Sequence, residues 1–168
     1  VLAQAQTEAA AYDMMAQVNT WYVDSSSGNL YLLPTVSPLV VLPRTEAWYK
    51  NSGDEFDLGN DATAAAKALG YDADAHDHVI FAYSGGPGAF NGLASVGGKT
   101  VWLRSATVSV AVHELGHNLG LLHANFWDTG GQSIIGPGSV MEYGNSYDWM
   151  GSSSSSNGDF NVVYKHFM

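Results

Sequence analysis

The chain has 168 residues, of which 46% are hydrophobic and 13% charged; its formal net charge is −10, and it contains no cysteine. This composition suits one compact extracellular domain, and the acidity argues against nucleic acids and anionic membranes as partners, because both are polyanions. The absence of cysteine excludes disulfides and thiol chemistry, so any metal site must use nitrogen and oxygen ligands.

The first part of the chain predicts a helix followed by broken strands. Apolar residues recur at helical spacing over residues 7–22. Residues 30–42 are rich in β-forming side chains, but Pro34 and Pro38 confine them to edge or broken strands. No apolar stretch approaches the roughly 20 residues that a membrane-spanning helix needs. The chain begins without a methionine or a basic-then-apolar leader, so we expect a mature or excised piece of a longer protein.

The middle of the chain predicts a short helix and two strands. Asn60 and Asp61 can cap an alanine-rich helix that ends at Leu69, beside a helix-stopping glycine. Residues 78–83 and 100–103 have the apolar, β-branched and aromatic composition of short strands.

A second amphipathic helix follows. Val108, Val112, Leu115 and Leu119 form an apolar stripe that can bury one side of a helix ending near Gly120. This helix is therefore predicted to belong to the core as well as to carry a candidate site.

Beyond this helix the chain is glycine-rich and lacks periodicity, including a low-complexity serine run at residues 152–156. A loop of such length in a compact domain is usually functional, disordered or held by other contacts. Residues 160–168 again show helical spacing. Because this pattern stops at Met168, we expect the natural chain to continue.

The segment AVHELGHNLGLLHANF contains three histidines at a metal-ligand spacing. His113 and His117 lie four residues apart, so on a helix their rings share one face and can share one ion. Glu114 lies on a different row, which leaves its carboxylate free to hold a water on that ion. Gly120 tolerates the positive φ that ends a helix sharply, so the chain can turn there and bring His123 back as a third ligand.

Three neutral imidazoles leave one coordination position of Zn²⁺ open to water, as in catalytic zinc sites. Such an ion lowers the pKa of its water from about 15.7 toward about 7. Glu114 can then act as the general base of peptide-bond hydrolysis and pass the proton to the departing amine. The alternative, a core helix with exposed histidines, explains neither Gly120 nor the third histidine. The pattern therefore favours one catalytic zinc ion.

The stretch 113–123 fits the pattern HExxHxxGxxH and resembles the signature of metzincin zinc peptidases. Downstream, residues 148–151 (DWMG) resemble the tight methionine turn beneath the zinc ion in that clan. HELGHNLGLLHAN followed by EYGNSYDWMG is most similar to the gametolysin type of peptidase. The resemblance implies that Met150 supports the zinc site structurally, as Gly120 does; ordinary core filling by Met150 is the alternative.

The resemblance implies an α+β fold in which residues 1–168 form a single catalytic domain, truncated at its C-terminus. An upper half (about residues 1–120) would hold a twisted mixed sheet and the active-site helix. A smaller, irregular lower half (about residues 121–168) would end in a helix. Extended substrate would lie between the halves and pair with an edge strand, for which residues 92–103 are the candidate. The resemblance also implies a secreted enzyme made with a propeptide.

The chain departs from some metzincins at two positions. They place a tyrosine two residues after the turn methionine, where it can touch zinc, whereas this chain has Ser152 there. Tyr143 and Tyr147 are the candidate replacements. Ala124 follows the third histidine, where several better-known metzincin families have another residue, so those families are not assigned.

Other polar stretches have alternative interpretations. Residues 76–78 (HDH) have a spacing that chelates metal from a strand, yet a polar lead-in to the next strand explains them equally well. Residues 54–61 offer oxygen ligands for Ca²⁺, but they do not match the EF-hand spacing and also suit a solvated loop with a helix cap. Asp128, Glu142 and Asp148 can bond the backbone of the lower half, orient a zinc ligand or bind calcium.

We therefore expect a monomeric, secreted zinc metalloendopeptidase that acts on extracellular proteins or peptides, with Glu114 as catalytic base and no nucleic-acid or membrane partner. The sequence assigns no substrate-binding residue. One rival is a non-catalytic binding or adhesion domain on a metzincin scaffold, which would normally show a replaced base or ligand; none is replaced here. The other is a structural zinc domain, which needs a carboxylate or another histidine as fourth ligand.

Overall fold

The computed structural model describes residues 7–131, 133–152 and 158–168. Most of the low-complexity serine run at residues 152–156 lies outside the described residues. Among the described residues, no helix has both the length and the apolar character needed to cross a membrane. The elements in chain order are α1 (Glu8–Ser25), α2 (Glu46–Asn51), α3 (Glu55–Ala68), the short 3-10 helix η1 (Ala73–Ala75), β1 (Val79–Ala82), β2 (Gly92–Ala94), β3 (Thr100–Leu103), α4 (Val108–Asn118), β4 (Phe126–Asp128), β5 (Ser139–Met141) and α5 (Val162–Phe167).

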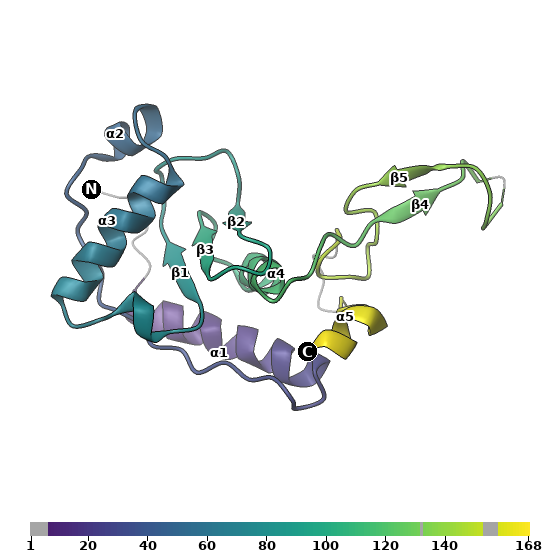
Figure 1. The fold of residues 1–168 in the computed structure, drawn as a ribbon, viewed down its shortest axis with the longest axis horizontal. Coiled ribbons are helices and arrows are strands. Elements are labelled where there is room, and N and C mark those ends of the chain that lie inside the picture. The colour runs from purple at the N-terminus through teal and green to yellow at the C-terminus, as the bar shows by residue number, and fades with distance from the viewer. Residues whose placement is uncertain (1–6, 132, 153–157) are drawn as a thin grey trace.

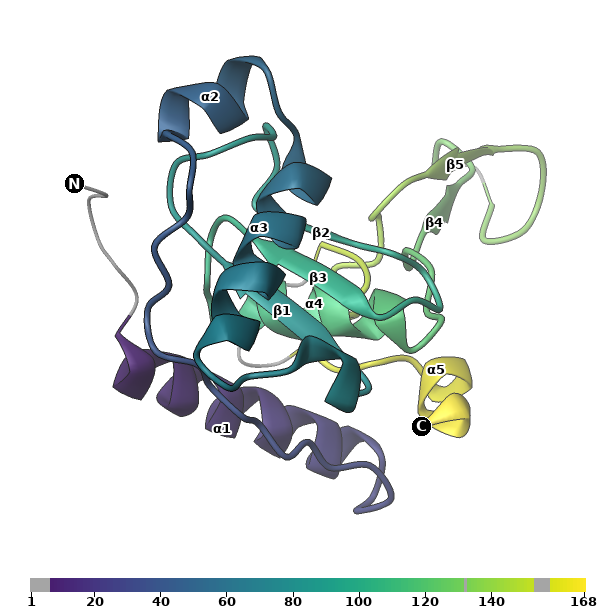
Figure 2. The same cartoon turned by 60° about the vertical axis from the view of Figure 1, so that its left-hand side comes forward.

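A small three-stranded mixed sheet lies between the helices α3 and α4. Its strand order is β1-β3-β2, with β1 parallel and β2 antiparallel to the central strand β3. The helix α3 lies across one face of this sheet, whereas α4 and then α1 lie on the other (Figures 1 and 2). The predicted edge region, residues 92–103, divides in the structure: only β2 is an edge strand, and β3 is central.

The alternation of side chains along β3 explains this layering. Val101 and Leu103 are fully buried in the main apolar cluster, which they share with residues of α1 and α4. Trp102 points to the opposite face, where its indole N–H donates to the Glu55 carbonyl of α3 at 2.8 Å. On the other side, the Tyr22 hydroxyl of α1 donates to a carbonyl of α4, that of Val112, at 2.7 Å. A hydrogen bond thus ties α3 to the sheet and another ties α1 to α4, while buried apolar area holds both helical layers on the sheet.

The helix α3 starts earlier than predicted. Its N-cap is Asp54, whose carboxylate accepts from the Asp57 N–H at 2.9 Å, so the predicted cap at Asn60 and Asp61 lies inside the helix. The acidic stretch is therefore helical and not a loop. Arg44 Nη1 lies 3.8 Å from Asp57 Oδ1, and Arg44 Nε lies 3.5 Å from Asp61 Oδ2. These carboxylates therefore face a cation of the protein, and nothing in their arrangement supports a calcium site.

The prediction of edge or broken strands over residues 30–42 was wrong. This segment has neither helix nor strand and runs back along α1 (Figures 1 and 2). Side chains of α1 satisfy part of its backbone: the Leu32 N–H donates to Asn19 Oδ1 at 2.6 Å, and the Val36 N–H to the Tyr12 hydroxyl at 3.3 Å. Its prolines lack the N–H that a ladder needs, so the segment packs against a helix instead of pairing with a strand.

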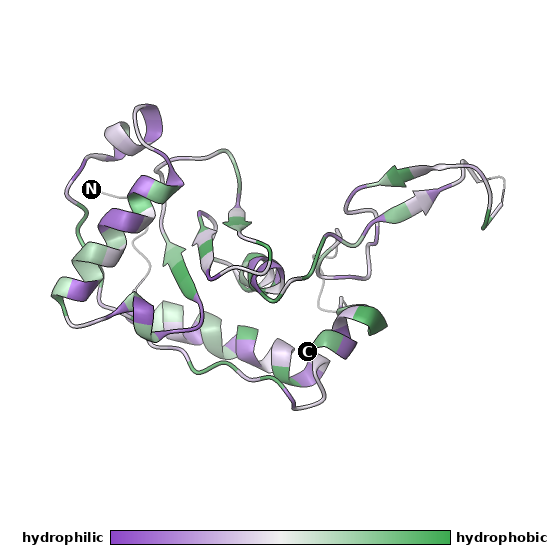
Figure 3. Ribbon diagram, viewed as in Figure 1, coloured by the Kyte–Doolittle hydropathy of each residue, from purple (hydrophilic) through white to green (hydrophobic). Residues whose placement is uncertain are grey.

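The chain after α4 contains a hairpin that the sequence reading missed. Strands β4 and β5 pair antiparallel, with Phe126 opposite Met141 and Asp128 opposite Ser139, and the hairpin projects away from the other elements (Figures 1 and 2). Strand β5 is hydrophobic in Figure 3, yet its side chains are exposed. The rest of this part is irregular until α5, the helix predicted near the C-terminus.

Candidate metal centre

The helix α4 begins and ends as its sequence requires. The Thr107 hydroxyl caps its N-terminus by accepting from the Val110 N–H at 3.4 Å. After the last turn, Gly120 has a φ of +92°, a left-handed conformation that a side chain disfavours. The Gly120 N–H donates to the His117 carbonyl at 2.8 Å, which closes the end of the helix. The chain therefore turns at Gly120 and runs toward His123.

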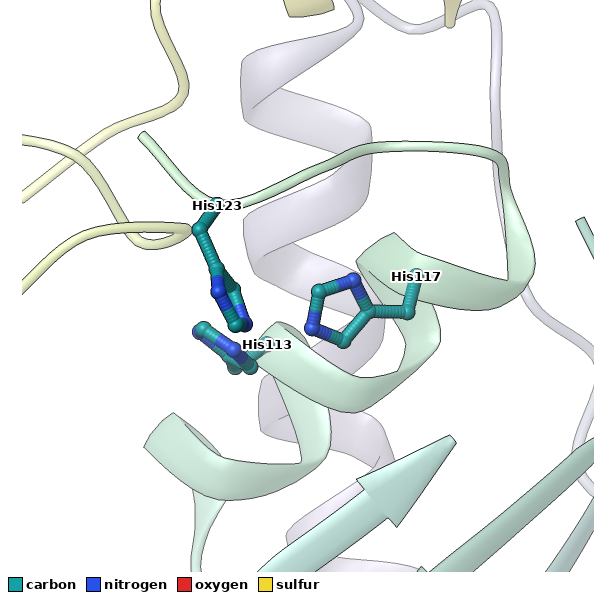
Figure 4. A group of neighbouring side chains, drawn as sticks. All are labelled: His113, His117 and His123. Atoms are coloured by element: carbon teal, nitrogen blue, oxygen red, sulfur yellow. The ribbon is translucent and has the colours of Figure 1, made fainter. Parts of the chain in front are cut away.

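Three imidazoles converge beside α4 (Figure 4). His113 and His117 come from successive turns of the helix and His123 from the returning chain, and their ligand atoms all lie within 4.8 Å of one another. Within residues 7–131, 133–152 and 158–168, they form the only group of His, Asp or Glu side chains close enough to hold one metal ion. The structure thus brings together all three histidines of the motif.

One nitrogen of each ring is held by an oxygen of the protein. A ring that donates its Nδ1–H in this way keeps the lone pair of Nε2 for a metal ion, and the hydrogen bond sets the orientation of the ring. Three rings held in this way match the three-histidine type of catalytic zinc site. The distances from Nδ1 are 2.7 Å to the Trp149 carbonyl for His113, 2.8 Å to the Leu121 carbonyl for His117, and 2.8 Å to Glu142 Oε1 for His123.

Burial favours the neutral form of two of these rings. It lowers the pKa of both His113 and His117, because surroundings of low polarity disfavour the charged imidazolium. The bond to the Trp149 carbonyl opposes this effect in His113 without overcoming it. Since a metal ion binds neutral imidazole, the lowered pKa of both rings favours the state that binds metal.

Glu114 lies beside the histidine cluster and is nearly inaccessible, with 7% of its surface exposed. Burial raises the pKa of its carboxyl to about 7. The side chain lies against β2, where a Cβ added to Gly92 would be 2.6 Å from both Cγ and Oε1 of Glu114. Gly92 therefore provides the space for this carboxylate. The sequence alone did not indicate this role of Gly92, because the contact with Glu114 arises only when β2 packs on α4.

The methionine turn lies directly under α4. Met150 is fully buried, and a Cβ added to Gly116 would lie 2.5 Å from its Sδ atom, so the sulfur fills the space left by a helical glycine. The Met150 carbonyl accepts from the Ala124 N–H at 2.7 Å. The turn thus contacts both the helix that carries two of the histidines and the residue that follows the third.

A buried carboxylate holds this turn together. Asp148 is 1% exposed; it accepts from the Met150 N–H at 2.8 Å, and from the backbone and side-chain amides of Asn161 at 3.0 and 2.7 Å. Asp148 therefore ties the turn to the chain that leads into α5. Glu142 bonds an imidazole and Asp128 accepts from the Gly130 N–H at 2.8 Å, so of the alternatives raised for these acids, backbone bonding and imidazole orientation both occur.

Tyr143 lies over the histidines. Its ring centroid is 3.8 Å from that of His123, and the ring is stacked at 5.9 Å on His113. Burial raises the pKa of the Tyr143 phenol, and the negative charges of Glu142 and Glu114 raise it further. The phenol is therefore close enough to Glu114 to be affected by its charge. The other candidate, Tyr147, is 80% exposed and has no part in these contacts.

Two cavities open at the cluster: all three histidines line the smaller one, and His113 also lines the larger one. One, of about 360 Å³, extends past Phe90, Asn91 and Trp149, and the other, of about 250 Å³, follows β2 past Leu93 and Val96. Four residues line both: Gly92, His113, Glu114 and Tyr143. A substrate in extended conformation that passed through both cavities would contact these four residues.

The remaining histidine pair is not assembled into a site. His78 Nδ1 lies 3.3 Å from Asn118 Oδ1, and neither His78 nor His76 belongs to a group of ligands within the described residues. The polar lead-in to β1 is therefore the interpretation that the structure favours for residues 76–78.

We expect Glu142→Ala to lower the zinc affinity about 10-fold, the weaker end of the effect typical of a residue that orients a histidine ligand, because Glu142 is largely exposed. The matched control is Asp128→Ala, which removes a hairpin carboxylate that accepts from the backbone N–H of Gly130. Calorimetric titration with Zn²⁺ measures both. Equal affinities for the two variants would contradict an orienting role of Glu142.

The mixed sheet covered by helices on both faces, and the cluster of three imidazoles on and after α4, are compatible with a metzincin-like domain and define a candidate metallopeptidase centre. Comparison with known families agrees. The family model described as Gametolysin peptidase M11 matches residues 11–159, and the chain belongs to this family. A search of curated proteins found no match. Membership of the family indicates a metallopeptidase, whose substrates are proteins or peptides.

Proposed function

We propose that this protein is a zinc-dependent endopeptidase of extracellular proteins, in which His113, His117 and His123 hold one zinc ion and Glu114 is the general base. The observation that carries the proposal is the convergence of three imidazoles whose Nδ1 atoms are all bonded to protein oxygens, next to a buried carboxylate. We also propose one secreted, monomeric catalytic domain with an upper half over about residues 1–120 and a lower half over about residues 121–168.

The donor set fits zinc. Imidazole nitrogens suit Zn²⁺, and three protein ligands with a fourth position left open are the arrangement of catalytic zinc sites. Within the described part of the chain, no carboxylate or further histidine joins the group of three, which argues against a closed structural site. When bound, the ion polarises a substrate carbonyl and lowers the pKa of a water molecule.

Residues around the histidines would have distinct roles in the reaction. Glu114, held in place by β2 and buried, would take a proton from the attacking water and deliver it to the amine that departs. The contact between Gly116 and Met150 would hold α4 and the chain that returns to His123 in a fixed relative position. No observation favours the rival adhesion domain, since the base and the ligands are all retained.

The proposal predicts that a chelator abolishes hydrolysis of a casein-type substrate and that stoichiometric Zn²⁺ restores it. Activity is followed by the release of acid-soluble peptides, and circular dichroism verifies that the chelated protein keeps its helices. Ca²⁺ added in place of Zn²⁺ serves as the control and should restore nothing, because a nitrogen donor set does not suit calcium. Hydrolysis that continues at full rate in the chelated protein would refute a zinc-dependent mechanism.

A further inference from the structure

Tyr143 lines both cavities beside the histidine cluster. Both cavities are lined by the same four residues, Gly92, His113, Glu114 and Tyr143. Of these, Gly92 has no side chain, His113 has its Nδ1 bonded to a carbonyl, and Glu114 is a carboxylate. The phenol of Tyr143 is therefore the neutral hydroxyl donor among the residues shared by both cavities.

The backbone at Tyr143 has a conformation that a bulky residue disfavours. Its φ of +59° is left-handed, a conformation that costs free energy for a bulky side chain and that glycine adopts without strain. Two contacts hold it: the Tyr143 N–H donates to Asn125 Oδ1 at 3.1 Å, and the ring lies on His123. Strained residues of this kind gather at functional sites.

A hydrogen-bond donor at this place would assist peptide hydrolysis beside a bound metal ion. Negative charge grows on the carbonyl oxygen of the scissile bond, and a prearranged hydrogen-bond donor stabilises it. A phenol has an ordinary pKa near 10 and keeps its proton at neutral pH. Its contact with His123 limits how far the ring can move, so the O–H needs little reorganisation when the charge develops.

We propose that Tyr143 is a catalytic residue that donates a hydrogen bond to the scissile carbonyl oxygen as it gains negative charge. This role rests on the proposed peptidase function. The alternative is that the ring only packs against His123 and thereby positions that imidazole. The two roles differ in what they need: donation needs the hydroxyl, whereas packing needs only the ring.

The test is Tyr143→Phe, which keeps the ring and removes the hydroxyl. Loss of one such donor is expected to lower kcat about 100-fold, with KM for a short peptide changed less than about twofold. The zinc affinity, measured by calorimetry, should stay the same, because phenylalanine still packs on His123. Tyr147→Phe is the matched control: Tyr147 is 80% exposed and lines neither cavity, so this variant should behave as the wild type.

A second measurement does not depend on turnover. A phosphonate peptide carries a charged oxygen in place of the scissile carbonyl, and Tyr143→Phe should bind it at least about 10-fold more weakly than the wild type does. Equal phosphonate affinity and equal kcat in an active wild type and the variant would overturn the role of Tyr143 alone. A loss of zinc affinity that matched the loss of kcat would also overturn it, in favour of packing. A zinc-loaded wild type that neither cleaves peptides nor binds the phosphonate would overturn the peptidase function as well.

Discussion

Glu114→Gln is expected to lower kcat by about 10²- to 10⁴-fold, the range that general acid–base catalysis contributes. The amide has nearly the same shape as the carboxylate, so it fits the space that Gly92 leaves beside β2, yet it cannot accept a proton from water. Zinc affinity should remain within a few-fold of the wild-type value, because Glu114 does not belong to the cluster of three ligands. Steady-state hydrolysis of a fluorogenic peptide and calorimetric zinc titration separate the two effects.

The matched control for this substitution is Glu8→Gln. Glu8 lies in the exposed first turn of α1, so the same chemical change there should leave both kcat and zinc affinity unaltered. Wild-type activity in Glu114→Gln would remove the general base from the mechanism. A loss of zinc together with activity would instead make Glu114 part of the metal site.

His117→Ala is expected to abolish tight zinc binding, with a loss of affinity larger than the 10- to 100-fold that the removal of an outer partner typically causes. His117 contributes one of three converging nitrogens, and two imidazoles alone make a weak site. The loss should also appear in stability. A ligand at 100 times its Kd raises the free energy of unfolding by about 2.7 kcal/mol, so added Zn²⁺ should raise the midpoint of thermal unfolding in the wild type but not in this variant.

The control here is His166→Ala. His166 is exposed on α5 and belongs to no group of ligands within the described residues, so its removal should preserve the stabilisation by zinc. The same zinc-dependent shift of the unfolding midpoint in His117→Ala would contradict the assignment of His117 as a ligand.

Local sequence patterns predicted the parts of this site that depend on neighbouring residues. The spacing of His113 and His117 is a property of one helix, and the left-handed turn at Gly120 that follows it is a property of one glycine. The strands at β1 and β3 were recognised because their runs are short, apolar and bounded by turn residues. Helical periodicity was therefore enough to predict α1 and α4, and the composition of short apolar runs was enough to predict β1 and β3.

Contacts between distant segments could not be predicted in this way. The start of α3 was placed too late, because Gly59 interrupts the helical pattern; a Cβ there would lie 3.0 Å from Phe81, so close packing on the sheet explains this glycine. The space that Gly92 gives to Glu114, and the stacking of Tyr143 on His123, also depend on tertiary structure. The hairpin β4–β5 was missed because its strands are short and their apolar side chains face solvent.

The contact between Gly116 and Met150 restricts how this family member can change. Because the Met150 sulfur occupies the volume that a Cβ at position 116 would need, a larger residue at 116 is tolerated only after the side chain at 150 has become smaller. A shorter residue at 150 alone would leave a cavity under α4. Divergence at either position therefore passes through a less stable intermediate, and the pair is expected to covary among homologues or to remain invariant.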